Sequence, residues 1–128
     1  MKKILIISIL SAVFATAHEC GDAEIQADLN ACMTAEYENA DKALNAVYSS
    51  YRAVLNNSQK ATPKNAQAAW IEYKDLSCSF ESSAAEGESI RLIIFNQCLT
   101  KKTKIRTEEI KELLSYREGD LACPMSGK

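Results

Sequence analysis

Hydrophobic residues recur every three or four positions throughout the stretch between Asp22 and Asn57. They are Ile25, Leu29, Met33, Tyr37, Ala40, Leu44, Val47, Tyr48, Tyr51 and Leu55. This period is typical of an amphipathic helix that buries one face, and no proline or glycine interrupts it. The pattern therefore predicts a long helix that Asp22 caps and that ends at Asn56-Asn57-Ser58.

Two further stretches show the same period. Thr62-Pro63 predicts the start of a second helix, because threonine caps helices and proline fits the first helical position. The apolar face of this helix is predicted to consist of Ala66, Ala69, Trp70, Tyr73, Ser77 and Phe80. Gly87 breaks the pattern, and Ser89 predicts the start of a third helix that ends at Gly119. No stretch alternates with period two for more than a few residues, so we predict an all-α fold, a small three-helix antiparallel bundle.

The first 17 residues have the organisation of a secretory signal peptide. Lys2 and Lys3 precede an apolar run that reaches Ala15, and Ala15-Thr16-Ala17 provides small residues for cleavage. The run is shorter than the about 20 residues that a transmembrane helix needs. We therefore expect a cleaved signal peptide over residues 1–17, a helical domain over residues 18–117 and a tail over residues 118–128. The mature protein is expected to be periplasmic or secreted, without a stable membrane anchor.

The charge of the predicted mature chain limits the classes of partner that it is expected to bind. Removal of Lys2 and Lys3 leaves 13 basic and 17 acidic residues, a net charge of −4. This balance argues against nucleic acid, whose binding relies on basic side chains that neutralise phosphates. It is compatible with a cationic protein partner.

All five cysteines follow the predicted cleavage site, which favours disulfides. In a bundle with turns near residues 60 and 87, Cys32, Cys78 and Cys98 lie at one level. The favoured bridge is Cys78 with Cys98, which leaves Cys20 with Cys32. The rival arrangement joins Cys32 to Cys98 and Cys20 to Cys78. Cys123 follows the far end of the third helix and is the expected odd cysteine.

The sequence offers little catalytic chemistry. The single histidine, His18, sits at the predicted mature N-terminus, which excludes histidine-based catalytic and metal sites inside the domain. Glu81, Glu86 and Glu88 could form a carboxylate pair that acts on a glycoside, although a solvated acidic loop is the simpler interpretation. We expect a protein that is not an enzyme and has no cofactor or metal.

Four motifs resemble one family of exported bacterial proteins. Asp41-Lys42-Ala43-Leu44-Asn45-Ala46-Val47-Tyr48 is similar to D-x-x-L-N-x-x-Y, and Trp70-Ile71-Glu72-Tyr73-Lys74-Asp75-Leu76-Ser77-Cys78 is similar to W-x-x-[YF]-R-D-x-x-C. Gly87-Glu88-Ser89 with Cys98 resembles G-G-S-x8-C, and Cys98-Leu99 with Thr103 and Arg106 resembles C-L-x-x-x-T-x-x-R. The family is the LprI-like family, named for a lysozyme inhibitor.

The chain departs from these motifs at two positions: Lys74 stands where arginine is usual, and Glu88 replaces the second glycine. The motif residues are interpreted as structural. Within the second motif, Trp70, Tyr73 and Ser77 share a helical face bordered by Cys78, which favours a buried core beside a disulfide over an aromatic ligand site.

The resemblance implies an exported helical protein that binds and inhibits lysozyme. Lysozyme is cationic and its cleft holds two carboxyls, so an acidic inhibitor would be steered toward it. A serine or a cationic side chain could meet those carboxyls. Glu86, Glu88, Ser89 and Arg91 provide both in one predicted turn, which we take as the candidate partner contact, with a plain helix-capping turn as the alternative. The alternative function is an envelope interaction or assembly protein with a different protein partner.

Overall fold

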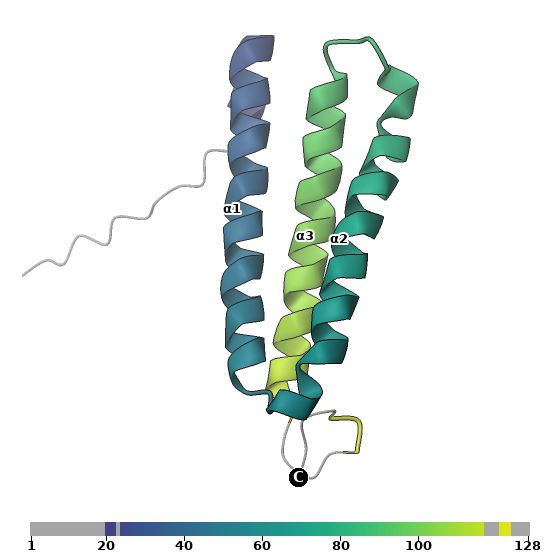
Figure 1. Ribbon diagram of the computed structural model, residues 1–128. Helices are drawn as coiled ribbons and strands as arrows, with labels where there is room; N and C mark the ends of the chain where they lie inside the picture. Colours follow the sequence, from purple (N-terminus) through teal and green to yellow (C-terminus); the bar gives the residue numbers. More distant parts are fainter. Residues whose placement is uncertain (1–19, 23, 117–120, 124–128) are drawn as a thin grey trace, which may run out of the picture.

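Three long α-helices make up most of the described part of the chain. The computed structural model describes residues 20–22, 24–116 and 121–123 (Figure 1). The helices are α1 (Gln26–Ala53), α2 (Ala61–Glu81) and α3 (Arg91–Ser115), with short 3₁₀ turns η1 (Cys20–Asp22), η2 (Asn57–Gln59) and η3 (Ser83–Ala85). No strand occurs among the described residues. The prediction of a small all-α bundle of three helices is confirmed.

The three helices do not contact one another equally. The chain runs down α1, up α2 and down α3, so that consecutive helices are antiparallel (Figure 1). The interface between α1 and α3 is the most extensive, and α2 packs mainly on α3. The third helix is therefore the element on which the other two are assembled.

The core is narrow and divides into two clusters. Leu44, Tyr51, Leu55 and Ile110 form the first, which Val47, Tyr48, Trp70, Leu113 and Leu114 surround. Cys78, Cys98 and Leu99 form the second, against which Tyr37 and Phe95 pack. Leu44, Tyr51 and Leu55 belong to the hydrophobic stripe predicted for the first helix, and its core-facing direction is confirmed.

The predicted apolar face of the second helix is confirmed only in part: Trp70 packs against the first core cluster, but Tyr73 and Phe80 do not face the core. Tyr73 and Phe80 are 58% and 80% exposed, whereas Gln67, Lys74 and Cys78 are the buried residues of α2. At about 100° per residue, Tyr73 lies about 140° and Phe80 about 160° around the helix axis from Cys78. Because Cys78 faces α3, Phe80 has to point away from α3. The Tyr73 ring still reaches the edge of α3, where Lys102 Nζ lies 5.3 Å from its centre.

The ends of the helices also differ from the predicted ones. Asp22 belongs to η1, and α1 begins at Gln26 without a side-chain cap. Thr62 lies inside α2, and the turn before that helix is capped instead by Asn56, whose side chain accepts a hydrogen bond from the backbone N–H of Gln59. The side chain of Ser89 likewise does not cap α3. The predicted end at Gly119 lies outside the described residues.

The predicted signal peptide over residues 1–17 also lies outside the described residues. Among the helices that the structure describes, none combines the length and the apolar character needed to cross a membrane.

Two disulfides staple the bundle. One joins Cys78 of α2 to Cys98 of α3, and the other joins Cys20 of η1 to Cys32 of α1, with Cα atoms 5.6 and 5.7 Å apart. This is the pairing that the sequence favours, rather than its rival. Cys123 belongs to neither disulfide and is buried.

Removing the bridge between α2 and α3 should destabilise the protein most. Cys78 and Cys98 close a loop with a sequence separation of 20 and lie in a buried cluster. Restriction of the unfolded chain by such a loop stabilises by about 3 kcal/mol. We expect the Cys78→Ala/Cys98→Ala variant to lose about that free energy of unfolding in urea denaturation.

The Cys20→Ala/Cys32→Ala variant is the matched control, because this bridge fastens only a 3₁₀ turn to the first part of α1. It should lose less stability. An equal or larger loss in the control would contradict the assignment of the main staple to Cys78 and Cys98.

Candidate functional site

A buried lysine connects the second helix to the first. Lys74 is only 4% exposed, and its Nζ donates a hydrogen bond to the Tyr37 hydroxyl at 2.7 Å. Asp75 Oδ1 lies 3.4 Å from the same nitrogen. Burial alone lowers the pKa of Lys74, but the interactions with Tyr37 and Asp75 outweigh it and raise the pKa above its ordinary value. Lys74 is therefore a paired cation inside the bundle.

Trp70 lies between two cations from different helices. The Lys74 ammonium is 5.5 Å from the centre of the Trp70 ring, and the Arg106 guanidinium is 5.9 Å from it. Arg106 Nε also donates to Gln67 Oε1 at 3.0 Å, and its Nη1 donates to Glu109 Oε2 at 2.9 Å. Of these interactions, the contacts of Arg106 with Trp70 and Gln67 hold α3 to α2. In the second and fourth motifs, Trp70, Lys74 and Arg106 thus contact residues of their own chain.

The other motif residues divide between the core and the surface. Leu44 and Thr103 are fully buried, and Tyr48 is partly buried against the first core cluster. The exposed motif residues are Asn45, which donates to Asp41, together with Tyr73 and Asp75. Sequence similarity alone does not distinguish these two groups.

Glu81 is held as a carboxylate rather than as an acid. The Lys102 ammonium lies 2.9 Å from Glu81 Oε1, and the Ser77 hydroxyl donates to the same oxygen at 3.0 Å. Hydrogen bonds from Lys102 and Ser77 lower the pKa of Glu81. A glycosidase needs a general acid whose pKa is raised. The surroundings of Glu81 therefore disfavour that role.

The predicted contact turn forms one small surface feature between α2 and α3. A depression of about 340 Å³ is lined by Glu86, Gly87, Glu88, Ser89, Arg91, Leu92 and Phe95. Arg91 Nε lies 3.0 Å from Glu86 Oε2, and the Ser89 carbonyl accepts a hydrogen bond from Gln26 at 3.4 Å. Gly87 adopts a φ of +80°, which suits glycine, whereas Glu88 does not have a positive φ. The structure thus brings together all four residues predicted for this contact.

A second pocket, which the sequence does not indicate, lies at the opposite end of the bundle. It has a volume of about 430 Å³, and its lining includes Tyr48, Tyr51, Leu55, Pro63 and Arg106. Burial is the main cause of the raised pKa of Tyr51. The pocket is largely apolar, and Arg106, the one charged group among its described lining residues, already pairs with Glu109.

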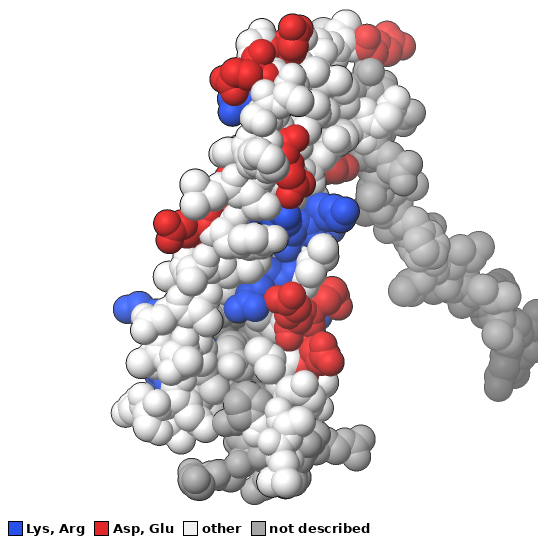
Figure 2. Space-filling model, turned by 90° about the vertical axis from the view of Figure 1, so that its right-hand side faces the viewer, with Lys and Arg blue, Asp and Glu red and all other residues white. Residues whose placement is uncertain are grey.

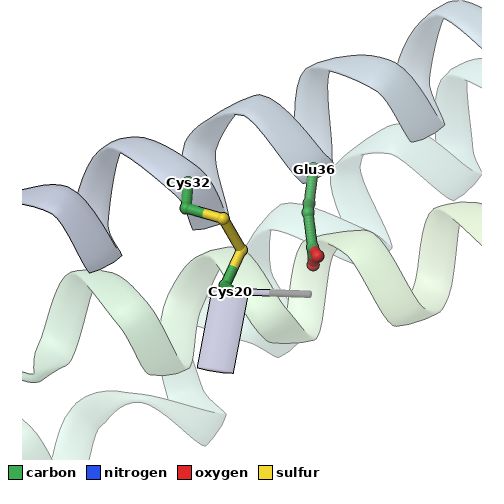
Figure 3. A group of neighbouring side chains, drawn as sticks. All are labelled: Cys20, Cys32 and Glu36. Atoms are coloured by element: carbon green, nitrogen blue, oxygen red, sulfur yellow. A yellow bond between two sulfur atoms is a disulfide. The ribbon is translucent and has the colours of Figure 1, made fainter. Parts of the chain in front are cut away.

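The disulfide at the start of the domain lies beside a carboxylate. The sulfur atoms of Cys20 and Cys32 and a carboxylate oxygen of Glu36 all lie within 4.8 Å of one another (Figure 3). Metal ions bind cysteine as the thiolate, whereas the Cys20 and Cys32 sulfurs are joined to each other in a disulfide. In this oxidised form the group does not provide a thiolate ligand set.

Comparison with known proteins identifies one family. Residues 17–110 match the family model described as "Lysozyme inhibitor LprI". An uncharacterised protein of Rhizobium meliloti (strain 1021) is 33% identical over 113 residues, which cover 78% of this chain and 81% of that protein. No solved structure matches.

The buried lysine gives a direct test of the packing between helices. In Lys74→Met the apolar stem remains, but the Tyr37 hydroxyl loses its charged partner. Hydrogen bonds to charged groups contribute about 1.5–3 kcal/mol, so we expect a loss of that size in urea denaturation at neutral pH. Lys104→Met is the control, because Lys104 is exposed and should change stability by less than about 0.5 kcal/mol. Equal losses in the two variants would refute the structural role of Lys74.

The same pair of variants predicts a dependence on alkaline pH. The folded-state pKa of Lys74 is raised above 10.5, so its stabilising contribution is present below that pH and disappears as the pH rises through the folded value. The stability difference between wild type and Lys74→Met should therefore stay constant from pH 7 to about pH 10 and shrink at more alkaline pH. Denaturation curves recorded across this range provide the measurement. A difference that grows in alkali would show the opposite sign of the pKa shift.

Proposed function

Since the chain belongs to the LprI lysozyme-inhibitor family, we propose that it is an exported protein that binds and inhibits lysozyme-type muramidases. The observation that carries the proposal is the family match over residues 17–110, which spans all of α1 and α2 and most of α3. On this proposal, cleavage of residues 1–17 releases a periplasmic or secreted domain.

The rigidity of the bundle supports an inhibitory role. Cys78–Cys98 fixes α2 on α3, and Lys74 links α2 to α1 through Tyr37. A surface held in place before binding loses less conformational entropy when a partner binds it. A small bundle held by disulfides is therefore suited to blocking the site of an enzyme by binding alone, without catalysing a reaction.

Charge supports a cationic partner. The predicted mature chain carries a net charge of −4, and opposite charge accelerates the encounter of two proteins. Lysozyme is a cationic protein whose cleft contains two carboxyls. An acidic inhibitor would be drawn to the enzyme by its overall charge.

The turn between α2 and α3 is the proposed contact with the cleft. The Ser89 hydroxyl and the Arg91 guanidinium are groups that can pair with the carboxyls of the cleft, and Glu86 and Glu88 can pair with basic residues of the enzyme around that cleft. Arg91 already pairs with Glu86, but this ion pair is substantially exposed on both sides. Exposed pairs contribute little, so exchanging Glu86 for a lysozyme carboxyl requires little free energy.

Inhibition of cell-wall lysis is the direct test. Purified mature protein, residues 18–128 with its disulfides formed, is mixed with a cationic c-type lysozyme, and the clearing of a suspension of bacterial cell walls is followed by turbidity. We expect the initial rate of clearing to fall with increasing protein and to approach zero at a molar excess. The rate should recover when salt is added, because charge contributes to the encounter.

Cell walls mixed with the protein alone are the control, and they should not clear, because an inhibitor does not hydrolyse peptidoglycan. Undiminished clearing at a large excess of protein would exclude lysozyme as the partner and favour an envelope interaction with another protein. Clearing by the protein alone would instead favour a hydrolase.

A further inference from the structure

The second helix presents its apolar stripe to solvent. Tyr73, Leu76 and Phe80 are 58%, 65% and 80% exposed. They follow one another at intervals of three and four residues and therefore share one side of α2. The Cys78–Cys98 bond prevents the helix from turning this side inward, since Cys78 must face α3. We call these three side chains the outer α2 face.

Exposed apolar side chains that gather on one side of a helix are typical of an interaction surface, whereas single scattered ones are not. Of these three side chains, Phe80 is the most exposed, and it lies at the end of α2 that adjoins the contact turn. Aromatic residues with a polar rim are the side chains that most often dominate binding between proteins. The outer α2 face has this composition.

The negative charge of the protein is concentrated in the same segment. Residues 70–90 contain five carboxylates and one basic side chain, the buried Lys74, a net charge of −4. This equals the net charge of the whole predicted mature chain, so the remaining residues balance one another. Figure 2, which views the molecule from the side of α2, shows acidic groups around a broad uncharged area at the upper end and a cluster of basic groups across the middle.

Part of this charge is available to a partner. Glu81 and Glu86 pair with Lys102 and Arg91, but Glu72 and Glu88 have no ion pair among the described residues. The last turn of α2 contains no basic residue, so the negative end of the helix dipole is not offset within the helix. The outer α2 face therefore has an acidic margin.

We propose that the outer α2 face, with its margin of Glu72 and Glu88, is the surface that docks on a cationic lysozyme, with Phe80 as the central anchor. This inference rests on the proposed function and extends the contact from the turn along α2. Charge decides between the candidate occupants of the face. A second copy of the chain would place one acidic margin against another, whereas a cationic enzyme complements it.

The face can be tested without disturbing the fold. Leu76 and Phe80 are mostly exposed and belong to neither core cluster, so their truncation should leave the melting temperature unchanged. Ile71 offers a matched control on the same helix. It is 46% exposed and lies nine residues from Phe80, which places it on the opposite side of α2.

The experiment measures the affinity of full mature protein for a purified cationic c-type lysozyme by titration calorimetry. We expect Phe80→Ala and Leu76→Ala each to raise the Kd at least about tenfold, the threshold for an energetically important contact. Ile71→Ala should change the Kd less than about twofold. Glu72→Gln/Glu88→Gln should raise the Kd at low salt and reduce the dependence of the Kd on salt concentration.

Three results would overturn the docking surface, and they differ in what they imply for the proposed function. If wild type binds lysozyme and Phe80→Ala and Leu76→Ala bind equally well, the face is refuted while inhibition stands. If wild type does not bind, both are refuted. Light scattering that shows a dimer of the wild type, converted to monomer by Phe80→Ala, would assign the face to a second copy and refute the lysozyme assignment.

Discussion

The bond between Cys78 and Cys98 determines which side of the second helix faces the rest of the protein. Because α2 packs mainly on α3, this single link sets its rotation about its own axis. A helix has 3.6 residues per turn, so fixing position 78 also fixes positions 74, 73 and 80. Lys74 is turned inward as a result, and Tyr73 and Phe80 are turned outward. The packing of α2 and its free surface follow from the same constraint.

Burial of Lys74 requires compensation, because a cation transferred from water into a protein loses hydration. The Tyr37 hydroxyl, the Asp75 carboxylate and two aromatic rings provide it. Arginine, which the motif that this segment resembles has at this position, would offer a planar set of donors to the same neighbours. Lysine concentrates its charge at one nitrogen, and the 2.7 Å hydrogen bond to Tyr37 is its closest contact. The substitution therefore keeps the link between α1 and α2 with fewer directional contacts.

The sequence predicts much of this arrangement, but not its orientation. The stripe of α1 and the fold class follow from helical period, and the disulfide pairing follows from the levels of the cysteines in a hairpin. Periodicity does not state whether a stripe faces the core or solvent. The sequence does contain the information that fixes the orientation of α2. Cys78 and Phe80 are two residues apart and lie on nearly opposite sides of a helix, so they cannot both face α3. Burial of Lys74 could not be inferred, since lysines are almost never buried unless paired, and Tyr37 is distant in sequence.

A protein with a core this slender would ordinarily bury every aromatic side chain it could. Here Tyr73 and Phe80 remain outside, while a lysine and a glutamine occupy inward positions of α2. The disulfide makes this distribution tolerable, because a covalent link between α2 and α3 replaces apolar contacts that would otherwise hold the helix. Covalent and cation–aromatic contacts thus hold the inner side of α2, and the apolar residues of its outer side are not needed to hold the helix in place. The proposed docking surface would use these residues, so that stability and recognition would depend on opposite sides of α2.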